Sequence, residues 1–374
     1  MQLHRHQVKS LPACFTVASS KTFYLTNIVQ YSPEKHGSRI QFTFGDNVML
    51  KKNISFFDPL NKEFVLAAAG MSMIAYHPPV NDSLRILTND PYMVSRNKNI
   101  KNSLSFFDES LTEWTPPPTT GIGFGWNETS VRGYLFENKE RTEAIIAIKG
   151  TSLPFFGGDT AKNDKYTDNF IFSCCCAKVD RTWRPVCNCY HGNTKMCNST
   201  CIEDETRLQS NKSYYEYGKK IVQFVQKYII KHKNLALTGH SLGGSLSALL
   251  SLTFDIPAIT FNSPGERLFA ERLGLGQNPN IQIYHYGTES DPIFTGKCRG
   301  ITSSCYIGGY AMERYAMESK CHTGKVCAYP KKGIRDILYH QLSWLIKDFL
   351  KPLELPPCEY ETDCKDCEHW EFVK

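Results

Sequence analysis

Residues 235–250 read Leu-Ala-Leu-Thr-Gly-His-Ser-Leu-Gly-Gly-Ser-Leu-Ser-Ala-Leu-Leu, and this stretch decides the fold. Four residues suited to a buried strand run into Gly239-His-Ser-Leu-Gly243, and a small-residue amphipathic helix follows. That order is typical of a nucleophile elbow, a sharp strand-to-helix turn that holds a strained serine with its Oγ exposed. The flanking glycines are needed because a Cβ at either place would collide with the neighbouring strand or helix. The pattern predicts Ser241 as a nucleophile.

The alternative interpretation of this stretch is a Gly/Ser-rich turn before an ordinary helix. The bare pattern is weak, but strand, turn and helix in the required order are far more selective. The start of the helix also directs backbone N–H groups and the positive end of a dipole at the serine. We therefore favour a serine hydrolase.

Length and charge limit the possible functions. The 374 residues can bury a sizeable core and suit one large α/β domain with insertions or two smaller domains. The net charge of +6 comes without a long Lys/Arg run or aromatic-basic alternation, which argues against nucleic acid as a partner. The mild positive bias suits anionic lipid surfaces.

Fifteen cysteines are many for a cytosolic enzyme, and all but Cys14 fall within 174–201, 298–327 and 358–367. An oxidising, secretory-route compartment explains them most simply. A disulfide-stapled insertion is favoured over a zinc site, because His191 is the only histidine within the first cluster. The odd number leaves at least one thiol without an intramolecular partner. Mild support for a lumenal glycoprotein comes from five sequons, at Asn53, Asn81, Asn127, Asn198 and Asn211.

The N-terminus conflicts with that compartment. Residues 1–20 contain no apolar run long enough for a signal peptide or an anchor, and no later segment reaches transmembrane length. Either the start is incomplete or its export signal has an unrecognised form, and the sequence leaves this open.

The alternation of expected strands and helices predicts the α/β class with a mostly parallel sheet, and the elbow indicates an α/β-hydrolase fold. The expected helices are 63–76, ended by Pro78-Pro79, and 213–233, with Tyr217, Ile221, Val225 and Tyr228 on one face. The expected strands are 131–136, 143–149, 256–261 and 281–286, after short apolar pieces at 23–29, 40–44 and 48–50. The predicted domains are an irregular segment 1–60, a hydrolase domain 61–352 with a Cys-rich insertion at 171–205, and a Cys-rich tail 353–374.

The strand expected at 143–149 ends at Lys149-Gly-Thr-Ser152. In α/β hydrolases a strand end before the elbow supplies half of the oxyanion hole. We expect Thr151 to contribute its backbone N–H and its hydroxyl, and Leu242 to contribute its backbone N–H; a plain Gly-Thr turn is the alternative. Residues 153–169 could form a mobile lid.

The other two triad members should follow in the order acid, then histidine. Asp291 comes off the strand expected at 281–286, with Glu289 as the nearby alternative, and an Asp-Pro turn without catalytic role is also open. For the base, His340 opens an apolar-periodic helix, whereas His322 lies among cysteines and His369 is close to the C-terminus. The residues favour His340 over His322.

Several stretches together resemble the fungal vacuolar autophagy lipases of the class 3 lipase family. They are 148–152, 168–176 with its triple cysteine, 238–244, 262–266, 290–293, 320–325 and the Asp-Cys-x-Asp-Cys tail at 363–372. The resemblance covers most of residues 130–372. Two departures are the absence of a visible N-terminal anchor and the repeat of Tyr310-Ala-Met-Glu313 as Tyr315-Ala-Met-Glu318.

The resemblance implies Ser241, Asp291 and His340 as the triad, with Thr151 at the oxyanion. It implies hydrolysis of acyl esters in membrane lipids, without metal or organic cofactor, in the vacuole or lysosome lumen or at a multivesicular-body membrane. The residues leave two rivals: another secreted serine esterase or thioesterase, and a non-catalytic lipid-binding protein with a hydrolase-like core. Phospholipid and triacylglycerol both remain open as substrates, and so does the oligomeric state.

Overall fold

A computed structural model describes fifteen segments of the chain. They are residues 30–33, 40–43, 57–76, 94–96, 114–115, 122–126, 130–138, 142–151, 161–178, 185–192, 194–210, 213–229, 234–276, 280–297 and 317–374. The apolar pieces expected at 23–29 and 48–50, the first part of the proposed lid and most of the Tyr-Ala-Met-Glu repeat lie outside these residues. So do Cys14, Cys298 and Cys305.

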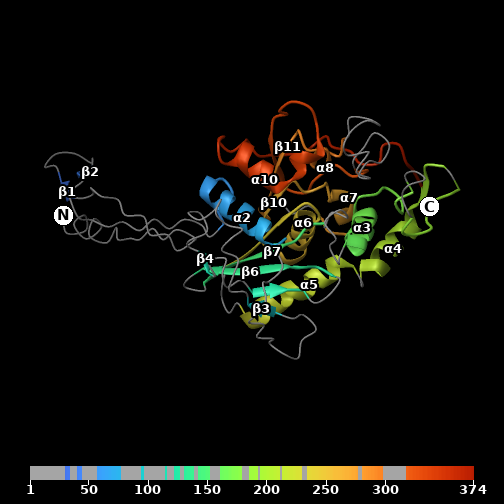
Figure 1. Ribbon diagram of the computed structural model, residues 1–374, viewed down its shortest axis with the longest axis horizontal. Coiled ribbons are helices and arrows are strands. Elements are labelled where there is room, and N and C mark those ends of the chain that lie inside the picture. Colours follow the sequence, from blue (N-terminus) through green and yellow to red (C-terminus); the bar gives the residue numbers. More distant parts are fainter. Residues whose placement is uncertain are drawn as a thin grey trace.

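A mixed sheet with a parallel centre forms the core of the described chain (Figure 1). Its strand order is β13-β12-β11-β10-β9-β7-β6-β5-β3, with β4 paired to β6. The strands are β3 Val94–Arg96, β4 Trp114–Thr115, β5 Ile122–Phe124, β6 Gly133–Asn138, β7 Glu143–Ile148, β9 Asn234–His240, β10 Ala258–Phe261, β11 Ile283–Thr288, β12 Lys325–Tyr329 and β13 Glu359–Tyr360. Strands β7, β9, β10, β11 and β12 pair in parallel, whereas the outer strands are antiparallel. The predicted α/β class with a mostly parallel sheet is confirmed.

Both faces of this sheet are covered, which explains the continuous apolar run of β7. Alternate residues of a strand point to opposite faces. Ile145 belongs to the same hydrophobic cluster as helix α2 (Lys62–Ile74) and the segment α10–η5 (Leu342–Leu345, then Ile346–Leu350). Ile146 belongs to the cluster on the other face, together with α5 (Tyr214–Phe224) and α6 (Leu242–Phe254). Figure 1 shows α2 and α10 together on one side of the sheet and α5 on the other.

The two predicted helices are present with changed ends. Helix α2 begins after Asn61, whose side chain accepts hydrogen bonds from the Glu63 and Phe64 amides, and it ends two residues before the expected Tyr76. Helix α5 passes into a π-turn, η3 (Val225–Ile229). Its fully buried residues are Tyr214, Tyr215, Gly218, Ile221 and Val222, and the half-buried Tyr217 of the expected stripe packs against the same core as Ile221 and Val225.

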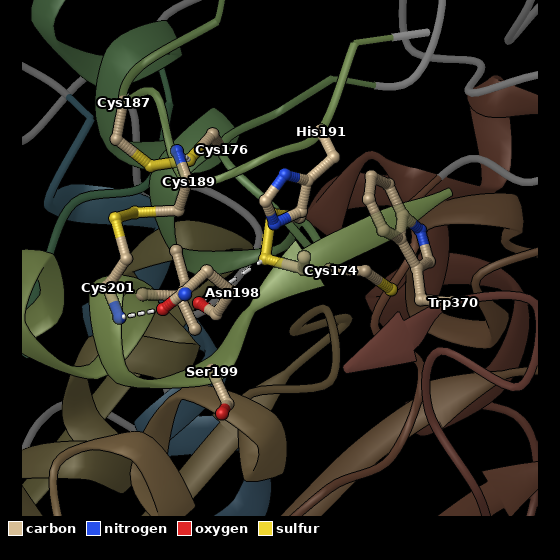
Figure 2. The surroundings of a disulfide bond; sticks show 12 residues. Cys174, Cys176, Cys187, Cys189, His191, Asn198, Ser199, Cys201 and Trp370 are labelled. Carbon is tan, nitrogen blue, oxygen red and sulfur yellow. Dashed lines mark hydrogen bonds between the residues drawn. A yellow bond between two sulfur atoms is a disulfide. The ribbon is translucent and has the colours of Figure 1, made fainter. Parts of the chain in front are cut away.

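Disulfides staple the cysteine-rich insertion, as the sequence predicted, and Cys174–Cys367 also joins it to the C-terminal tail. Strand β8 (Met196–Asn198) pairs in parallel with β14 (Glu371–Val373), and helix α4 (Ser199–Ser210) follows β8. Figure 2 shows neighbouring disulfides of the insertion, with Trp370 of the tail close to Cys174. Described cysteines form the pairs Cys174–Cys367, Cys175–Cys197, Cys176–Cys187, Cys189–Cys201, Cys321–Cys364 and Cys327–Cys358.

The remaining described elements are short. Strands β1 (Gln30–Pro33) and β2 (Ile40–Thr43) form a two-stranded antiparallel sheet. Helix α3 (Ala161–Ile171) includes the second half of the proposed lid. Three short segments follow strands of the sheet: α7 (Arg267–Arg272), α8 (Pro292–Thr295) and the 3-10 segment η4 (Ile337–His340). Within the described ranges, no helix combines the length and the apolar character needed to cross a bilayer.

Candidate active site

Ser241 lies at the turn between β9 and α6 with φ 56° and ψ −132°, an unfavourable conformation for a residue with a side chain. The turn is tight on both sides. A Cβ on Gly239 would lie 2.4 Å from the Gly243 carbonyl carbon, and a Cβ on Gly243 would lie 2.2 Å from the Ile148 carbonyl oxygen of β7. The steric requirement inferred for the two glycines is confirmed.

The structure brings Ser241, His340 and Asp291 into one hydrogen-bonded chain. His340 Nε2 lies 2.9 Å from Ser241 Oγ, and His340 Nδ1 lies 2.8 Å from Asp291 Oδ2. The Asp291 side chain is fully buried, whereas the His340 side chain keeps 15% of its surface exposed. This geometry can move a proton from the serine hydroxyl to an imidazole that a buried carboxylate orients.

Local structure places Asp291 and His340 at the carboxyl end of the parallel strands. Asp291 follows β11 and caps helix α8, where its Oδ1 accepts a hydrogen bond of 2.8 Å from the Ile293 amide. The Asp-Pro turn anticipated as an alternative is therefore present, but the second carboxylate oxygen still faces His340. His340 is the last residue of η4 and precedes α10.

A cavity of about 220 Å³ opens beside Ser241 and His340. Three predicted site residues, Thr151, Ser241 and His340, belong to its lining. The full lining is Met73, Tyr76, Thr151, Asp168, His240, Ser241, Ile293, Met317, His340, Gln341, Leu342 and Ser343. The cavity can hold part of an apolar chain next to the serine hydroxyl.

Thr151 and Leu242, the predicted oxyanion residues, both adjoin Ser241. A Cβ on Gly150 would lie 3.0 Å from Ser241 Cβ, and Thr151 is the next residue along the chain. Leu242 is the first residue of α6, where backbone N–H groups have no acceptor within the helix.

The Thr151 hydroxyl lies 2.8 Å from Asp168 Oδ2. Burial raises the pKa of Asp168 to about 8.

The alternative site residues lie elsewhere. His322 is buried with Nε2 2.9 Å from the Ser263 carbonyl oxygen, and its backbone N–H donates to Glu361. Glu289 accepts hydrogen bonds from Lys331 and Arg335 through its carboxylate and its carbonyl oxygen, respectively. His369 is exposed in the tail.

Two groups of described side chains have the spacing of metal ligands, Cys176 with Cys187 and Cys189, and Cys321 with Cys364 and Asp366. All of these sulfur atoms belong to disulfides. The oxidised sulfurs offer no thiolate to an ion, which agrees with the disulfide interpretation of the insertion.

Sequence reasoning missed three residues around His340: Tyr76, His240 and Asn262. His240 Nε2 lies 2.7 Å from the His340 carbonyl oxygen, and Asn262 Nδ2 lies 2.9 Å from that of Tyr339. His240 stood inside the elbow pattern, so its polar ring beside the nucleophile was the available signal.

Comparisons with known proteins identify similar sequences. Residues 202–295, which include Ser241 and Asp291, match the model of a phospholipase-like family, described as a Tle-like phospholipase domain. The protein named putative lipase ATG15 of Lodderomyces elongisporus is 38% identical over 303 residues, 75% of this chain and 53% of that protein. The protein of the same name from Candida glabrata is 41% identical over 264 residues, 67% of this chain and 51% of that protein.

Among solved structures, Lip2 lipase from Yarrowia lipolytica is 18% identical, with a TM-score of 0.34 over 63% of this chain and 74% of that one. Lipase II from Rhizopus niveus is 13% identical, with a TM-score of 0.33 over 74% of this chain and 82% of that one. Because these TM-scores are low, the fold class rests on the strand order of this structure and not on the two lipases. The chain spans about half the length of the curated relatives it matches. At this level of identity the chain is a homologue of the fungal proteins named putative lipase ATG15.

Proposed function

We propose that this chain is a serine hydrolase that cleaves acyl esters of membrane lipids. The observation that supports the proposal most directly is the hydrogen-bonded series Ser241–His340–Asp291 at a nucleophile elbow, beside a cavity. The similarity to proteins named as lipases and to a phospholipase-like family model supports the same reaction class.

In the proposed mechanism, His340 Nε2 takes the proton of Ser241 as Oγ attacks the ester carbonyl. Asp291 keeps the His340 Nδ1–H pointing inward and stabilises the imidazolium that forms. The imidazolium then returns the proton to the leaving alcohol. Water, deprotonated by His340 in the same way, hydrolyses the acyl-enzyme and releases a fatty acid.

The proposed oxyanion hole consists of the Leu242 and Thr151 backbone N–H groups and the Thr151 hydroxyl. The pKa of Asp168, about 8, keeps this carboxyl protonated below that pH. A protonated Asp168 can donate to Thr151 Oγ, which leaves the hydroxyl hydrogen of Thr151 for the oxyanion. Asp168 would thus set the direction of the Thr151 hydroxyl.

A lipid surface is the substrate that the surroundings of the cavity favour. Residues 331–353 are here called the rim segment. This segment contributes His340, Gln341, Leu342 and Ser343 to the lining of the cavity. Four of the nine large apolar side chains exposed in the described part of the chain belong to it: Ile334, Leu338, Trp344 and Leu353. The segment also has five basic and two acidic residues. Apolar side chains among cations suit an anionic bilayer.

The compartment belongs to the same proposal. Disulfides between described cysteines fit the secretory route. Together with the resemblance to vacuolar autophagy lipases, they favour a lumenal enzyme that acts on internal membranes of a vacuole or lysosome.

The test is fatty-acid release from phosphatidylserine vesicles and triolein dispersions by the wild type and Ser241→Ala. Release that disappears in the variant supports the proposal, and the ratio between the substrates identifies the lipid class. The rival, a lipid-binding protein without activity, predicts no release from either and no labelling of Ser241 by a fluorophosphonate.

A further inference from the structure

His240 precedes Ser241 and is held in one tautomer. Its Nε2 lies 2.7 Å from the His340 carbonyl oxygen, which can only accept, so Nε2 carries the hydrogen. Its Nδ1 is then the acceptor for the Tyr76 hydroxyl, at 2.7 Å. The series therefore runs Tyr76 O–H to His240 Nδ1, and His240 Nε2–H to the His340 backbone.

The His240 ring stays neutral beside His340. Burial, reinforced by the neighbouring His340, lowers the pKa of His240 to about 3, and the two ring centroids are 4.9 Å apart. A neutral ring can donate to the His340 carbonyl without placing a second positive charge next to an imidazolium.

Asn262, directly after β10, holds the same stretch of backbone. Its Nδ2 lies 2.9 Å from the Tyr339 carbonyl oxygen and 3.3 Å from that of His340. The backbone at His340 is thus bound from the ends of two adjacent parallel strands, β9 and β10. The backbone at His340 needs these hydrogen bonds, because the 3-10 segment η4 contains no fully buried side chain that would hold it in place.

The consecutive residues His240 and Ser241 contact the same residue at two points. Ser241 Oγ meets the His340 ring, and the His240 ring meets the His340 carbonyl. A shift of the rim segment away from the elbow would stretch both contacts at once. Small displacements between reacting groups reduce rates strongly, on the order of 10²-fold for 1 Å.

We propose that His240, oriented by Tyr76 and assisted by Asn262, is a positioning residue that fixes the backbone of His340 so that its Nε2 stays within reach of Ser241 Oγ. The inference rests on the proposed function, since it assigns His340 as the base. It adds a role for the histidine of the elbow, which acts through the backbone of His340 and takes no part in proton transfer.

The test compares His240→Leu, His240→Gln, Tyr76→Phe and the exposed-histidine control His369→Leu on a soluble short-chain ester. Leucine removes the donor, whereas glutamine keeps an N–H donor on a side chain of similar reach. We expect kcat to fall about 10²-fold in His240→Leu, with KM within about threefold, and to recover at least tenfold in His240→Gln. Tyr76→Phe removes one hydroxyl and should reduce kcat by about three- to tenfold. The control should match the wild type.

Two further readouts separate positioning from folding and from the proposed function. The thermal midpoint of each variant shows whether it is folded, and the downfield proton resonance of His340 Nδ1–H should broaden in His240→Leu and return in His240→Gln. Folded His240→Leu with wild-type kcat, or His240→Gln as impaired as His240→Leu, overturns the inference while Ser241-dependent turnover stands. A wild type without Ser241-dependent turnover overturns the proposed function instead.

Discussion

Glu361 of the C-terminal tail accepts hydrogen bonds from both the backbone N–H of His322, at 2.8 Å, and its Nδ1, at 3.3 Å. The other ring nitrogen, Nε2, lies 2.9 Å from the Ser263 carbonyl oxygen, so both nitrogens of His322 donate. Burial disfavours the imidazolium, but the hydrogen bond and charge of Glu361 outweigh it and raise the pKa of His322 to about 9. The histidine that competed with His340 in the sequence is thus a charged link between the body and the tail.

Stability should fall as the pH rises above about 6.5. His322 keeps its proton up to about pH 9 in the folded chain and only to 6.5 when unfolded, so its contribution is complete below 6.5 and lost by 9. Burial likewise raises the pKa of Glu266 to about 7 and that of Asp168 to about 8. These two carboxyls therefore also lower the stability of the fold as the pH rises.

Below about 6.5 a second pair of groups acts in the opposite direction. Burial lowers the pKa of His240 and of His285, so both stay neutral when folded while the unfolded chain takes up protons. We expect maximal stability between about pH 4.5 and 6.5. Calorimetry from pH 4 to 9 measures this, and His322→Gln should flatten the decline above 6.5; a midpoint that rises from pH 6.5 to 9 contradicts the assignment.

Asp291→Asn should reduce kcat on the order of 10³- to 10⁴-fold. An amide retains the shape and the cap of α8 but no longer supplies the carboxylate that holds the His340 tautomer and stabilises the imidazolium. Glu289→Gln is the matched control, because Glu289 lies two residues away and was the alternative acid in the sequence. It should retain kcat within about threefold. Equal losses in both variants would contradict the role of Asp291.

Thr151→Val should reduce kcat about 10²- to 10³-fold, as expected when one oxyanion donor is removed, and Thr151→Ser should restore most of it. The Asp168 carboxyl predicts an additional alkaline decline of kcat near pH 8, where its ionised form would recapture the Thr151 hydrogen. Asp168→Asn, which always carries donors, should lose that decline. A pH profile unchanged by Asp168→Asn argues against this coupling.

Ile334→Ser combined with Leu353→Ser should weaken binding to phosphatidylserine vesicles about tenfold or more. Each apolar side chain contributes about 1.5 kcal/mol or more when it leaves water. Sedimentation with vesicles in the Ser241→Ala background measures binding without hydrolysis. Leu208→Ser on α4 is the control, since Leu208 is 66% exposed but lies outside the rim segment. The rim segment is not the docking surface if Leu208→Ser weakens binding as much.

Removing the disulfide Cys174–Cys367 with paired serine substitutions should cost about 5 kcal/mol of unfolding free energy, because it closes a separation of 193 residues. The pair Cys176–Cys187 closes only 11 residues, and its removal should cost about 3 kcal/mol. Denaturant unfolding compares the two double variants. Reaction of the native, unreduced wild type with a thiol reagent at Cys174 would contradict the pairing itself.

The features predicted from the sequence were those that depend on neighbouring residues. The elbow at Ser241 follows from a strand, two glycines that only a missing Cβ permits, and a helix, all within sixteen residues. The apolar run of β7 indicated a strand covered on both faces, and Asp291 was found because it follows the end of a buried strand. Helix ends were less accurate, because α2 ends before the expected Tyr76 and α5 passes into a π-helical segment at Val225.

The sequence by itself thus determined the α/β class and the turn at Ser241, proposed Asp291 as the acid from its place after a strand, and indicated an oxidised cysteine framework without its pairings. The tertiary structure decided which histidine lies beside Ser241, because His322 and His340 differ in contacts with residues 39 to 99 positions away. It also decided the disulfide pairs, the bond between Thr151 and Asp168, and the anchoring of His340 by His240 and Asn262. The contacts around Ser241 arise when parallel strands bring their carboxyl ends to one edge, and the disulfides arise when distant segments pack together; local sequence patterns encode neither relation.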